Sequence, residues 1–411
     1  MRTQETGNNL GSRRFFLGLP LYYLAENMWT IVLLWLLLKL THSPIWMAWG
    51  VAWQTIPMVV VGIWGPHRGG GRTLSRLIAG QVLAMALGAG LFPHEPIGLI
   101  AIAAVNGWLY ARVIPAAQAY LMRTAPSGKL SHASARYELL SRLGMLLGPA
   151  LGGGVLMILP PNGILFALAM LWAGVSWCWI GIPLVAAVTD HNPRQKVWSG
   201  FGHAVKIVVR DRFLGTALVI RGVNNLLWPA FTLAIPLLSL HLWHTGSGGF
   251  GILRSAWGLS TILGTIVVVP LLVDRLKSVY FLSWLVSGLG FLGIAISRDY
   301  AWALAAAVMG AFGSPLVHVA LDTHIGHHID QEWQGRLFAL QQFIMSLLSV
   351  IGLSLVSWGL AITRPQTVLA TAGILMMVAA MVGLAWWHKV RTPAEHPRRH
   401  TPLIDAGGPC E

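Results

Sequence analysis

Long apolar blocks alternate with short polar breaks along nearly the whole chain. Each block holds about 20 residues, the length that an α-helix needs to cross the hydrocarbon core of a bilayer. Backbone groups find no water in that core, so a spanning block must satisfy its own hydrogen bonds as a helix. The pattern predicts an all-α membrane protein with twelve transmembrane helices. Their expected ranges are 15–38, 45–64, 74–92, 97–122, 132–157, 163–186, 213–239, 249–271, 279–296, 301–322, 336–361 and 366–386.

Composition supports this class of protein. Of the 411 residues, 55% are hydrophobic and 10% are charged, whereas a soluble domain carries about 25% charged residues. The first block, Phe15 to Leu38, is too long for the apolar core of a signal peptide and is not followed by a small-residue cleavage site. We therefore expect it to remain as the first span. Cys178 and Cys410 lie far apart and indicate no disulfide framework.

The positive charge follows the predicted topology. The formal net charge is +14, and 21 of the 28 Lys and Arg residues fall in the N-terminal tail, the loops after even-numbered spans and the C-terminal tail. Four lie toward the other side, and Arg112, Arg142 and Arg221 lie deep inside spans. Cytoplasmic loops are enriched in these residues, so we expect both termini in the cytoplasm. This explanation of the charge does not require nucleic acid as a partner.

The longest polar break divides the chain into two halves of six spans. Within it, Trp198, Phe201 and Val205 fall at helical spacing, with Lys206 and Arg210 on another face. This pattern predicts an amphipathic helix on the cytoplasmic membrane surface. The expected parts of the chain are an N-terminal tail 1–14, a first half 15–188, a linker 189–212, a second half 213–388 and a basic tail 389–411.

The two halves resemble each other in sequence. A shift of 200 residues superposes Pro115 on Pro315, Arg136 on Arg336 and Gly152 on Gly352, with no gap over roughly 40 residues. Because each half has an even number of spans, both have the same orientation. Such a parallel repeat is typical of transporters whose halves rock about a central site.

Four short runs carry a resemblance to a known family. They are LTHSP at 40–44, GPALGG at 148–153, VDR at 273–275 and QGRLFAL at 334–340. On these residues the chain resembles a major facilitator superfamily transporter over 15–386, and more narrowly the branch of enterobactin exporters and macrolide efflux proteins. The resemblance implies a secondary active transporter that exports a small amphipathic molecule, such as a drug, macrolide or siderophore, in exchange for protons.

The fifth span carries a glycine and proline motif. It consists of Gly144, Gly148, Pro149, Gly152 and Gly153. Glycines four residues apart let another helix approach closely, and proline bends a helix. The run resembles the antiporter motif of superfamily exporters, which implies a role in the direction of transport. Ordinary tight packing is the alternative interpretation.

The loop after the second span departs from the family pattern. The superfamily usually has an aspartate there, followed by arginine and further basic residues. This chain keeps Arg68 and Arg72 but has His67 at about the position of the aspartate, and a histidine cannot act as an anion. The second half keeps Asp274 and Arg275. The resemblance implies a conformational role for these residues and for Arg336, and we expect the first half to be gated differently.

One carboxyl group is predicted deep in the membrane. Glu26 lies near the middle of the first span, where an ionisable group is costly and is by default a functional candidate. It could bind and release a proton in each cycle. Arg112 resembles the arginine that the family uses in proton transfer and could tune Glu26. A purely structural ion pair between Glu26 and Arg112 is the alternative.

Polar and aromatic residues predict a central cavity. Asn224 and Asn225 occupy the place in the second half that Glu26 and Asn27 occupy in the first. The candidate cavity residues are Asn27, Trp29, Arg221, Asn224, Asn225, Trp228 and His318. For Arg142 we expect a mostly structural pair with Glu138, four residues earlier.

Several histidines follow the tenth span. His318 and Asp322 precede His324, His327 and His328, which are residue types that bind metals. The repeat places Asp322 at the membrane edge, so we interpret most of this cluster as a water-exposed cytoplasmic loop and expect no metal. His318 alone could be a titratable group in the cavity.

Several classes of protein are disfavoured. The chain has no phosphate-binding loop, nucleotide fold or nucleophile constellation, so we expect neither an enzyme nor an ATP-driven pump, and no cofactor. We expect a monomer in a bacterial cell membrane, with a small molecule, protons and lipid as partners. Alternatives of the same fold are an uptake symporter or facilitator, a lipid flippase, and a transport-inactive scaffold or sensor.

Overall fold

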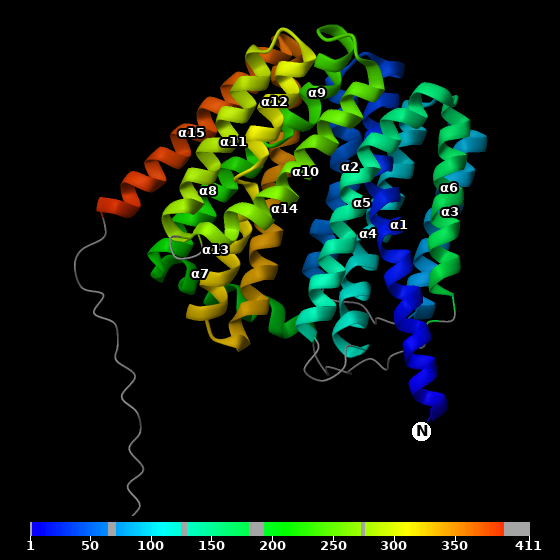
Figure 1. The fold of residues 1–411 in the computed structure, drawn as a ribbon, viewed down its shortest axis with the longest axis horizontal. Helices are drawn as coiled ribbons and strands as arrows, with labels where there is room; N and C mark the ends of the chain where they lie inside the picture. The colour runs from blue at the N-terminus through cyan, green and yellow to red at the C-terminus, as the bar shows by residue number, and fades with distance from the viewer. Residues whose placement is uncertain are drawn as a thin grey trace, which may run out of the picture.

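A computed structural model describes residues 2–64, 71–124, 130–180, 182, 193–272 and 276–389. Within these residues it contains fifteen α-helices and no strands. The first half comprises α1 (Arg2–Thr41), α2 (Pro44–Trp64), α3 (Gly71–Leu91), α4 (Pro96–Thr124), α5 (Leu130–Ile158) and α6 (Pro161–Trp179). After α7 (Pro193–Arg210), the second half comprises α8 (Arg212–Leu227), α9 (Pro229–His241), α10 (Gly246–Leu272), α11 (Leu276–Ile296), α12 (Tyr300–Ala311), α13 (Ser314–His328), α14 (Gln331–Ile362) and α15 (Pro365–Lys389). Figure 1 shows the two halves side by side.

The predicted all-α membrane fold is confirmed. Eleven helical segments of the described residues are long and apolar enough to cross a bilayer. The remaining expected span is α2, whose 21 residues include no charged side chain and reach about 30 Å at about 1.5 Å per residue. The first helix begins at Arg2, so most of the expected N-terminal tail extends the first span.

Two predicted spans are broken helices. The span expected at 213–239 is divided into α8 and α9 at Trp228, and the span expected at 301–322 is divided into α12 and α13 after Ala311. A proline stands just after each break, Pro229 in one and Pro315 in the other, and proline cannot donate the backbone hydrogen bond that would continue the preceding helix. Hydropathy alone does not reveal these breaks, because both segments stay apolar on average, with mean hydropathies of 1.4 and 1.7.

One helix ends earlier than expected. The sixth span was expected to reach residue 186, but α6 ends at Trp179 and Ile180 is extended. Pro183 follows closely, and the chain before a proline is biased away from the helical conformation.

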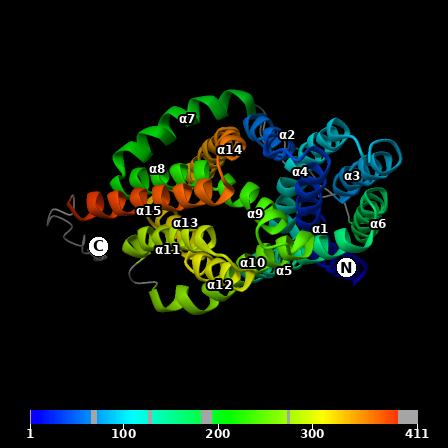
Figure 2. The same cartoon turned by 90° about the horizontal axis from the view of Figure 1, so that it is seen from above.

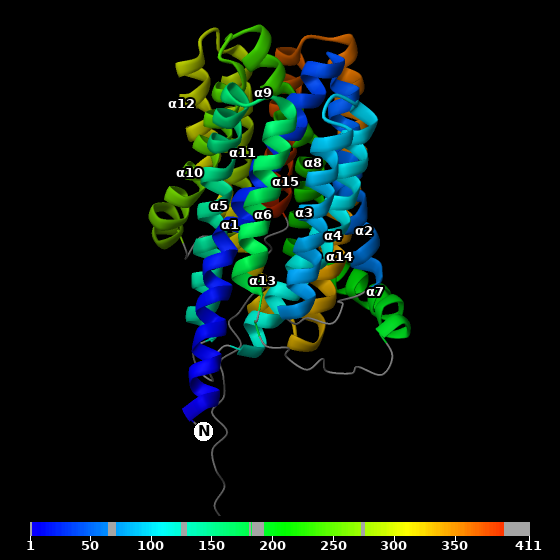
Figure 3. The ribbon, with the colours of Figure 1, turned by 90° about the vertical axis from the view of Figure 1, so that its right-hand side faces the viewer.

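The linker helix packs on the second half. α7 includes the amphipathic helix predicted from Trp198 to Arg210, and it lies along the outer side of α8 and α14 (Figure 2). The rings of His203 and Trp333 stack with their centroids 4.0 Å apart. α7 lies at the end of the molecule where α1 begins (Figure 3), which we call the α7 side. It is the side predicted to be cytoplasmic.

Within the first half, α1 and α5 approach closely. A Cβ atom on Gly144 would lie 2.6 Å from the carbonyl oxygen of Pro20, and one on Gly148 would lie 2.8 Å from that of Leu24. Both distances are too short for a real contact, so these positions require glycine. Gly152 continues the row against Met28. The three glycines therefore hold α5 directly on the backbone of α1.

The next glycine joins the two halves. A Cβ on Gly153 would overlap the carbonyl oxygen of Ser247 in α10, and the Ser247 hydroxyl donates to the Gly153 carbonyl at 3.0 Å. The hydroxyl of Ser255, also in α10, accepts from the N–H of Ala150 at 2.9 Å and donates to the carbonyl of Leu146 at 2.6 Å. These contacts flank Pro149 and form a seal between the halves, which we call the α5–α10 seal. It lies away from the α7 side.

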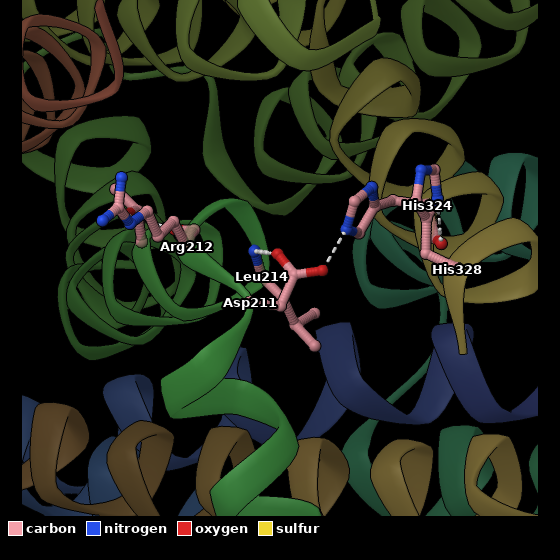
Figure 4. A network of polar contacts seen from close by, with 6 residues as sticks. Asp211, Arg212, Leu214, His324 and His328 are labelled. Carbon is pink, nitrogen blue, oxygen red and sulfur yellow. Dashed lines mark hydrogen bonds and ion pairs between the residues drawn. The ribbon is translucent and has the colours of Figure 1, made fainter. Parts of the chain in front are cut away.

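The histidines after the tenth span do not form a loop. α13 continues to His328, and His324 is only 6% exposed. Its Nε2 lies 2.7 Å from a carboxylate oxygen of Asp211, whose other oxygen accepts from the N–H of Leu214 at 2.9 Å (Figure 4). The water-exposed loop was therefore a wrong interpretation for His324, because its ring is buried and has Asp211 as its partner. Among the described residues, no three His, Cys, Asp or Glu side chains are arranged to hold a metal.

Asp211 carries an altered pKa. Burial favours the neutral carboxyl, but the hydrogen bonds from His324 and from the N–H of Leu214 outweigh it and hold the pKa of Asp211 below its usual range. The carboxylate thus caps α8 and ties it to α13.

We expect Gly153→Ala to destabilise the protein by about 1–3 kcal/mol, because its new methyl group would overlap α10. Gly154→Ala is the matched control, since a Cβ there has open space and alanine favours a helix by up to about 1 kcal/mol. Thermal unfolding in detergent measures both variants. Equal effects of the two substitutions would contradict the α5–α10 seal.

We expect Asp211→Ala to cost about 1–3 kcal/mol more than Asp299→Ala, because Asp211 loses both a helix cap and the bond to His324. Asp299 is a suitable control because it caps α12 through Trp302 from an exposed position. The folded-state pKa of Asp211 is lowered, so this difference should be present at neutral pH and diminish only as the pH falls below about 4. Unfolding curves at several pH values measure it, and a difference that already disappears between about pH 7 and 5 would be inconsistent with this role.

Candidate functional site

A polar cavity of about 420 Å³ lies between α2 and the helices of the second half. Thr55 and Met58 form its wall on the first half. The second half supplies three tryptophans, several hydroxyl and amide side chains, and one cation. These residues are Arg221, Asn225, Trp228, Trp257, Trp284, Ser287, Ser314, Val317, His318, Gln342, Met345, Ser346 and Ser349. No described Asp or Glu is among the lining residues, so the cavity is positively charged.

The cation of the cavity is Arg221. Its Nη2 lies 3.3 Å from Nδ1 of His318, which joins α8 to α13. An arginine only donates, so Nδ1 accepts in this contact and the imidazole is neutral. Arg221 Nη1 is buried and has no hydrogen-bond partner among the described residues. The guanidinium therefore keeps a donor for a further group.

The aromatic wall lies at the break between α8 and α9. The ring of Trp228 meets that of Trp257 edge-on at 5.4 Å, and Phe231 lies 4.6 Å from Trp257. Asn225 donates to the carbonyl of Met345 at 3.0 Å, which ties α8 to α14 at the edge of the cavity. The helix break thus brings an aromatic surface next to Arg221.

The structure separates the predicted cavity residues into two groups. Arg221, Asn225, Trp228 and His318 line the cavity. Asn27, Trp29 and Asn224 do not. Asn27 donates to the carbonyl of Tyr23, Trp29 is fully buried, and Asn224 donates to the carbonyl of Ile220. Helical phase explains the difference, because neighbouring residues on a helix point in different directions.

Glu26 is enclosed in a cluster of amides inside the first half. It is only 4% exposed and does not line the cavity. One carboxylate oxygen accepts from Gln81 of α3 at 2.5 Å, and the other accepts from Asn106 of α4 at 3.1 Å. Gln81 also donates to the Asn106 side-chain oxygen at 2.8 Å. Amides donate and accept, so this pair could bind Glu26 in either protonation state.

Sequence reasoning missed Gln81 and Asn106. Both are fully buried amides within apolar spans. A polar side chain at that depth needs a partner, and that was the available signal.

Arg112 is not the partner of Glu26. Its guanidinium carbon lies 4.6 Å from the centre of the Trp108 ring, and its Nε has no hydrogen-bond partner among the described residues. The alternative of a structural Glu26–Arg112 ion pair is therefore wrong for this structure. The predicted pair of Arg142 with Glu138 is confirmed, with a distance of 2.8 Å.

The remaining motif residues are only partly described. Arg336 lies at the start of α14, with its guanidinium 4.5 Å from the Trp333 ring centre. Arg72 is in α3, but its side chain lies outside the described part of the structure. The residues His67, Arg68, Asp274 and Arg275 lie outside the described residues altogether.

The comparisons with known proteins agree with this architecture. The Major Facilitator Superfamily family model matches residues 223–406. A search of curated protein sequences gives no significant match.

Solved transporter structures superpose on almost the whole chain. A mutant form of the nucleoside transporter NupG has a TM-score of 0.76 at 12% identity, covering 91% of this chain and 99% of that chain. A POT family transporter in complex with 5-aminolevulinic acid has a TM-score of 0.73 at 11% identity, covering 93% and 97%. The peptide transporter POT in complex with sulfate has a TM-score of 0.73 at 12% identity, covering 92% and 94%. This multi-pass membrane protein therefore has the major facilitator fold.

Proposed function

We propose that the chain is a proton-coupled exporter that moves a small amphipathic molecule across the cell membrane by alternating access. The observation that carries this proposal is the cavity between the halves, which combines a cation with three tryptophans. Its volume of about 420 Å³ falls in the range of small-molecule sites, roughly 300–1,000 Å³. The finer assignment to the branch of enterobactin and macrolide exporters rests on the sequence motifs.

The lining of the cavity favours one class of substrate. Trp228, Trp257 and Trp284 offer flat apolar surface, and Arg221 offers an unpartnered donor and a positive charge. An acceptor-rich or anionic molecule with an apolar or aromatic body complements such a site. Siderophores have this chemistry, whereas a cationic drug would be repelled by Arg221.

Alternating access requires two gates. The α5–α10 seal closes the side away from α7. Toward the α7 side, Arg142 of α5 is close enough to His318 of α13 to interact electrostatically, and so is Glu138 to Asp322. No hydrogen bond or ion pair joins these pairs among the described residues. Each pair joins groups of like charge, which repel each other, so these pairs do not form the gate on the α7 side.

Proton coupling would act through the contact between α1 and α5. Glu26 is next to Asn27, whose Cβ faces Gly148 at the close approach of the two helices. A change of charge in the amide cluster would alter how α1 packs on α5, and α5 carries the seal. Arg112 is held over Trp108, so its part in coupling would require it to leave that ring.

We expect Glu26→Gln to lower substrate movement driven by a pH gradient at least about tenfold in proteoliposomes, because glutamine cannot carry a proton. Substrate exchange in the absence of a gradient should persist. Glu95→Gln is the control, since Glu95 is exposed between α3 and α4. Gradient-driven transport by Glu26→Gln at the rate of the unmodified protein would remove Glu26 from the mechanism.

The direction of flux in the same vesicles tests the alternatives. Movement of substrate against the direction of proton entry supports antiport and export. Movement with the protons would establish an uptake symporter, and no movement across a broad panel of compounds would favour a transport-inactive protein.

We expect Arg221→Gln to weaken binding of an anionic ligand about tenfold or more, because a charge-assisted hydrogen bond is lost. Arg221→Lys should restore part of the affinity by restoring the charge. Quenching of tryptophan fluorescence measures binding, since three tryptophans line the cavity. Unchanged affinity in both variants would show that Arg221 does not contact the ligand.

A further inference from the structure

A second cavity lies outside the polar one. Its volume is about 400 Å³, and α7, α8 and α14 surround it. Its wall consists of aliphatic side chains, methionine and glycine, apart from Gln341. Met345 borders both cavities, so the two cavities are neighbours at the seam between α8 and α14.

The internal repeat explains why this cavity exists. The seam of α8 with α14 corresponds to the seam of α1 with α5, where Gly144, Gly148 and Gly152 bring the two backbones together. At the matching positions α14 has Ile344, Leu348 and Gly352. Gly352 is the glycine that α14 shares with α5. Here α14 lies close to α8, since a Cβ on Gly352 would overlap the Leu226 carbonyl.

The two larger side chains lie nearer the α7 side, and both line the cavity. Ile344 and Leu348 therefore hold α8 and α14 apart where the first half is tightly packed. The space is a specific difference between the halves, and α7 covers its end through Val205 and Val208.

The cavity opens toward the lipid-facing surface. Val219 of α8 lines it and is 67% exposed, and Val205 of α7 lines it and is 46% exposed. An engineered apolar cavity of about 150 Å³ already binds benzene, so a cavity of this size and polarity suits a hydrocarbon chain. Water would find one polar side chain there and is a poor occupant.

Cations lie at the α7 end of this cavity. Arg212 is exposed and lies on the helical face of Gly215 and Val219, three and seven residues before them. Arg336 stands four residues before the lining residue Leu340. Asp211, the acidic residue between α7 and α8, already interacts with His324 and with the N–H of Leu214.

An apolar slot beside exposed Arg212 and half-buried Arg336 complements a lipid that has a hydrocarbon chain and a negative headgroup. We propose that this cavity binds an acyl chain of an anionic phospholipid from the leaflet on the α7 side, with the phosphate near Arg212. The chain would lie between α8 and α14, on the far side of the seam from Arg221. Asn225 and Met345 join these two helices and line the polar cavity, so a bound lipid that shifts α8 or α14 would change the shape of that cavity.

Native mass spectrometry of the purified protein tests the proposal with dioleoyl phosphatidylglycerol and dioleoyl phosphatidylcholine as probes. We expect one tightly held phosphatidylglycerol per chain. Val219→Trp should lower its retention about tenfold by filling the cavity. The matched control is Val382→Trp in α15, which is 63% exposed and lines neither cavity. Equal retention in the two tryptophan variants would overturn the site.

The headgroup is tested separately. Arg212→Gln should lower the preference for phosphatidylglycerol over phosphatidylcholine about fivefold, since one cation near a membrane surface contributes about 1 kcal/mol. Arg298→Gln, at an exposed position between α11 and α12, should leave the preference unchanged. Equal binding of both lipids by the unmodified protein would overturn the anionic specificity.

A third measurement does not depend on the folding of a variant. A phosphatidylglycerol with a photoreactive group in its acyl chain should label peptides of α7, α8 and α14 in the unmodified protein. Labelling confined to other helices would overturn the proposal. Labelling of these helices by a transported compound, with none by the lipid, would also overturn it and would identify the cavity as a substrate site.

Discussion

Direct packing of helix backbones on α5 is the constraint on which the arrangement of the two halves depends. The lipid tails around a membrane protein are as apolar as its own side chains, so helices gain little from hydrophobic burial and associate through close packing. α5 meets this condition on two sides. Gly144 and Gly148 of α5 pack against the backbone of α1, and Gly153 of α5 packs against the backbone of α10. A single helix therefore sets both the position of α1 within its half and the distance between the halves.

Much of the fold was predictable because it follows from local chemistry. Span length, the distribution of lysine and arginine, and the repeat each leave a mark on consecutive residues. The bond between Arg142 and Glu138 was predictable for the same reason, since the two residues lie one turn apart. The helix breaks were missed because the segments around Trp228 and Phe312 stay apolar on average. Pro229 and Pro315, which lie just after the breaks, indicated a possible helix end, but the expected spans were assigned from hydropathy.

The candidate site was less predictable because its partners come from different helices. Glu26 was identified by its depth, but Gln81 and Asn106 belong to α3 and α4, and no spacing along the chain connects them. His324 was placed in water because the end of α13 was expected too early, and its partner Asp211 lies 113 residues away. The direction in which each side chain points from its helix was also hard to predict from the sequence. Trp29 and Asn224 have suitable chemistry but face away from the cavity.

The breaks at Trp228 and after Ala311 have a mechanical consequence. On the α7 side of the breaks, α8 carries Arg221 and α13 carries His318. Nη2 of Arg221 lies 3.3 Å from Nδ1 of His318. On the opposite side of the breaks, α9 contributes Phe231 to the buried core. There α12 packs against α11 where Gly310 meets Gly290. Two short, linked segments can tilt about these breaks while α9 and α12 keep their packing. In the proposed transport cycle, such a tilt would enclose the substrate before either half moves as a rigid body.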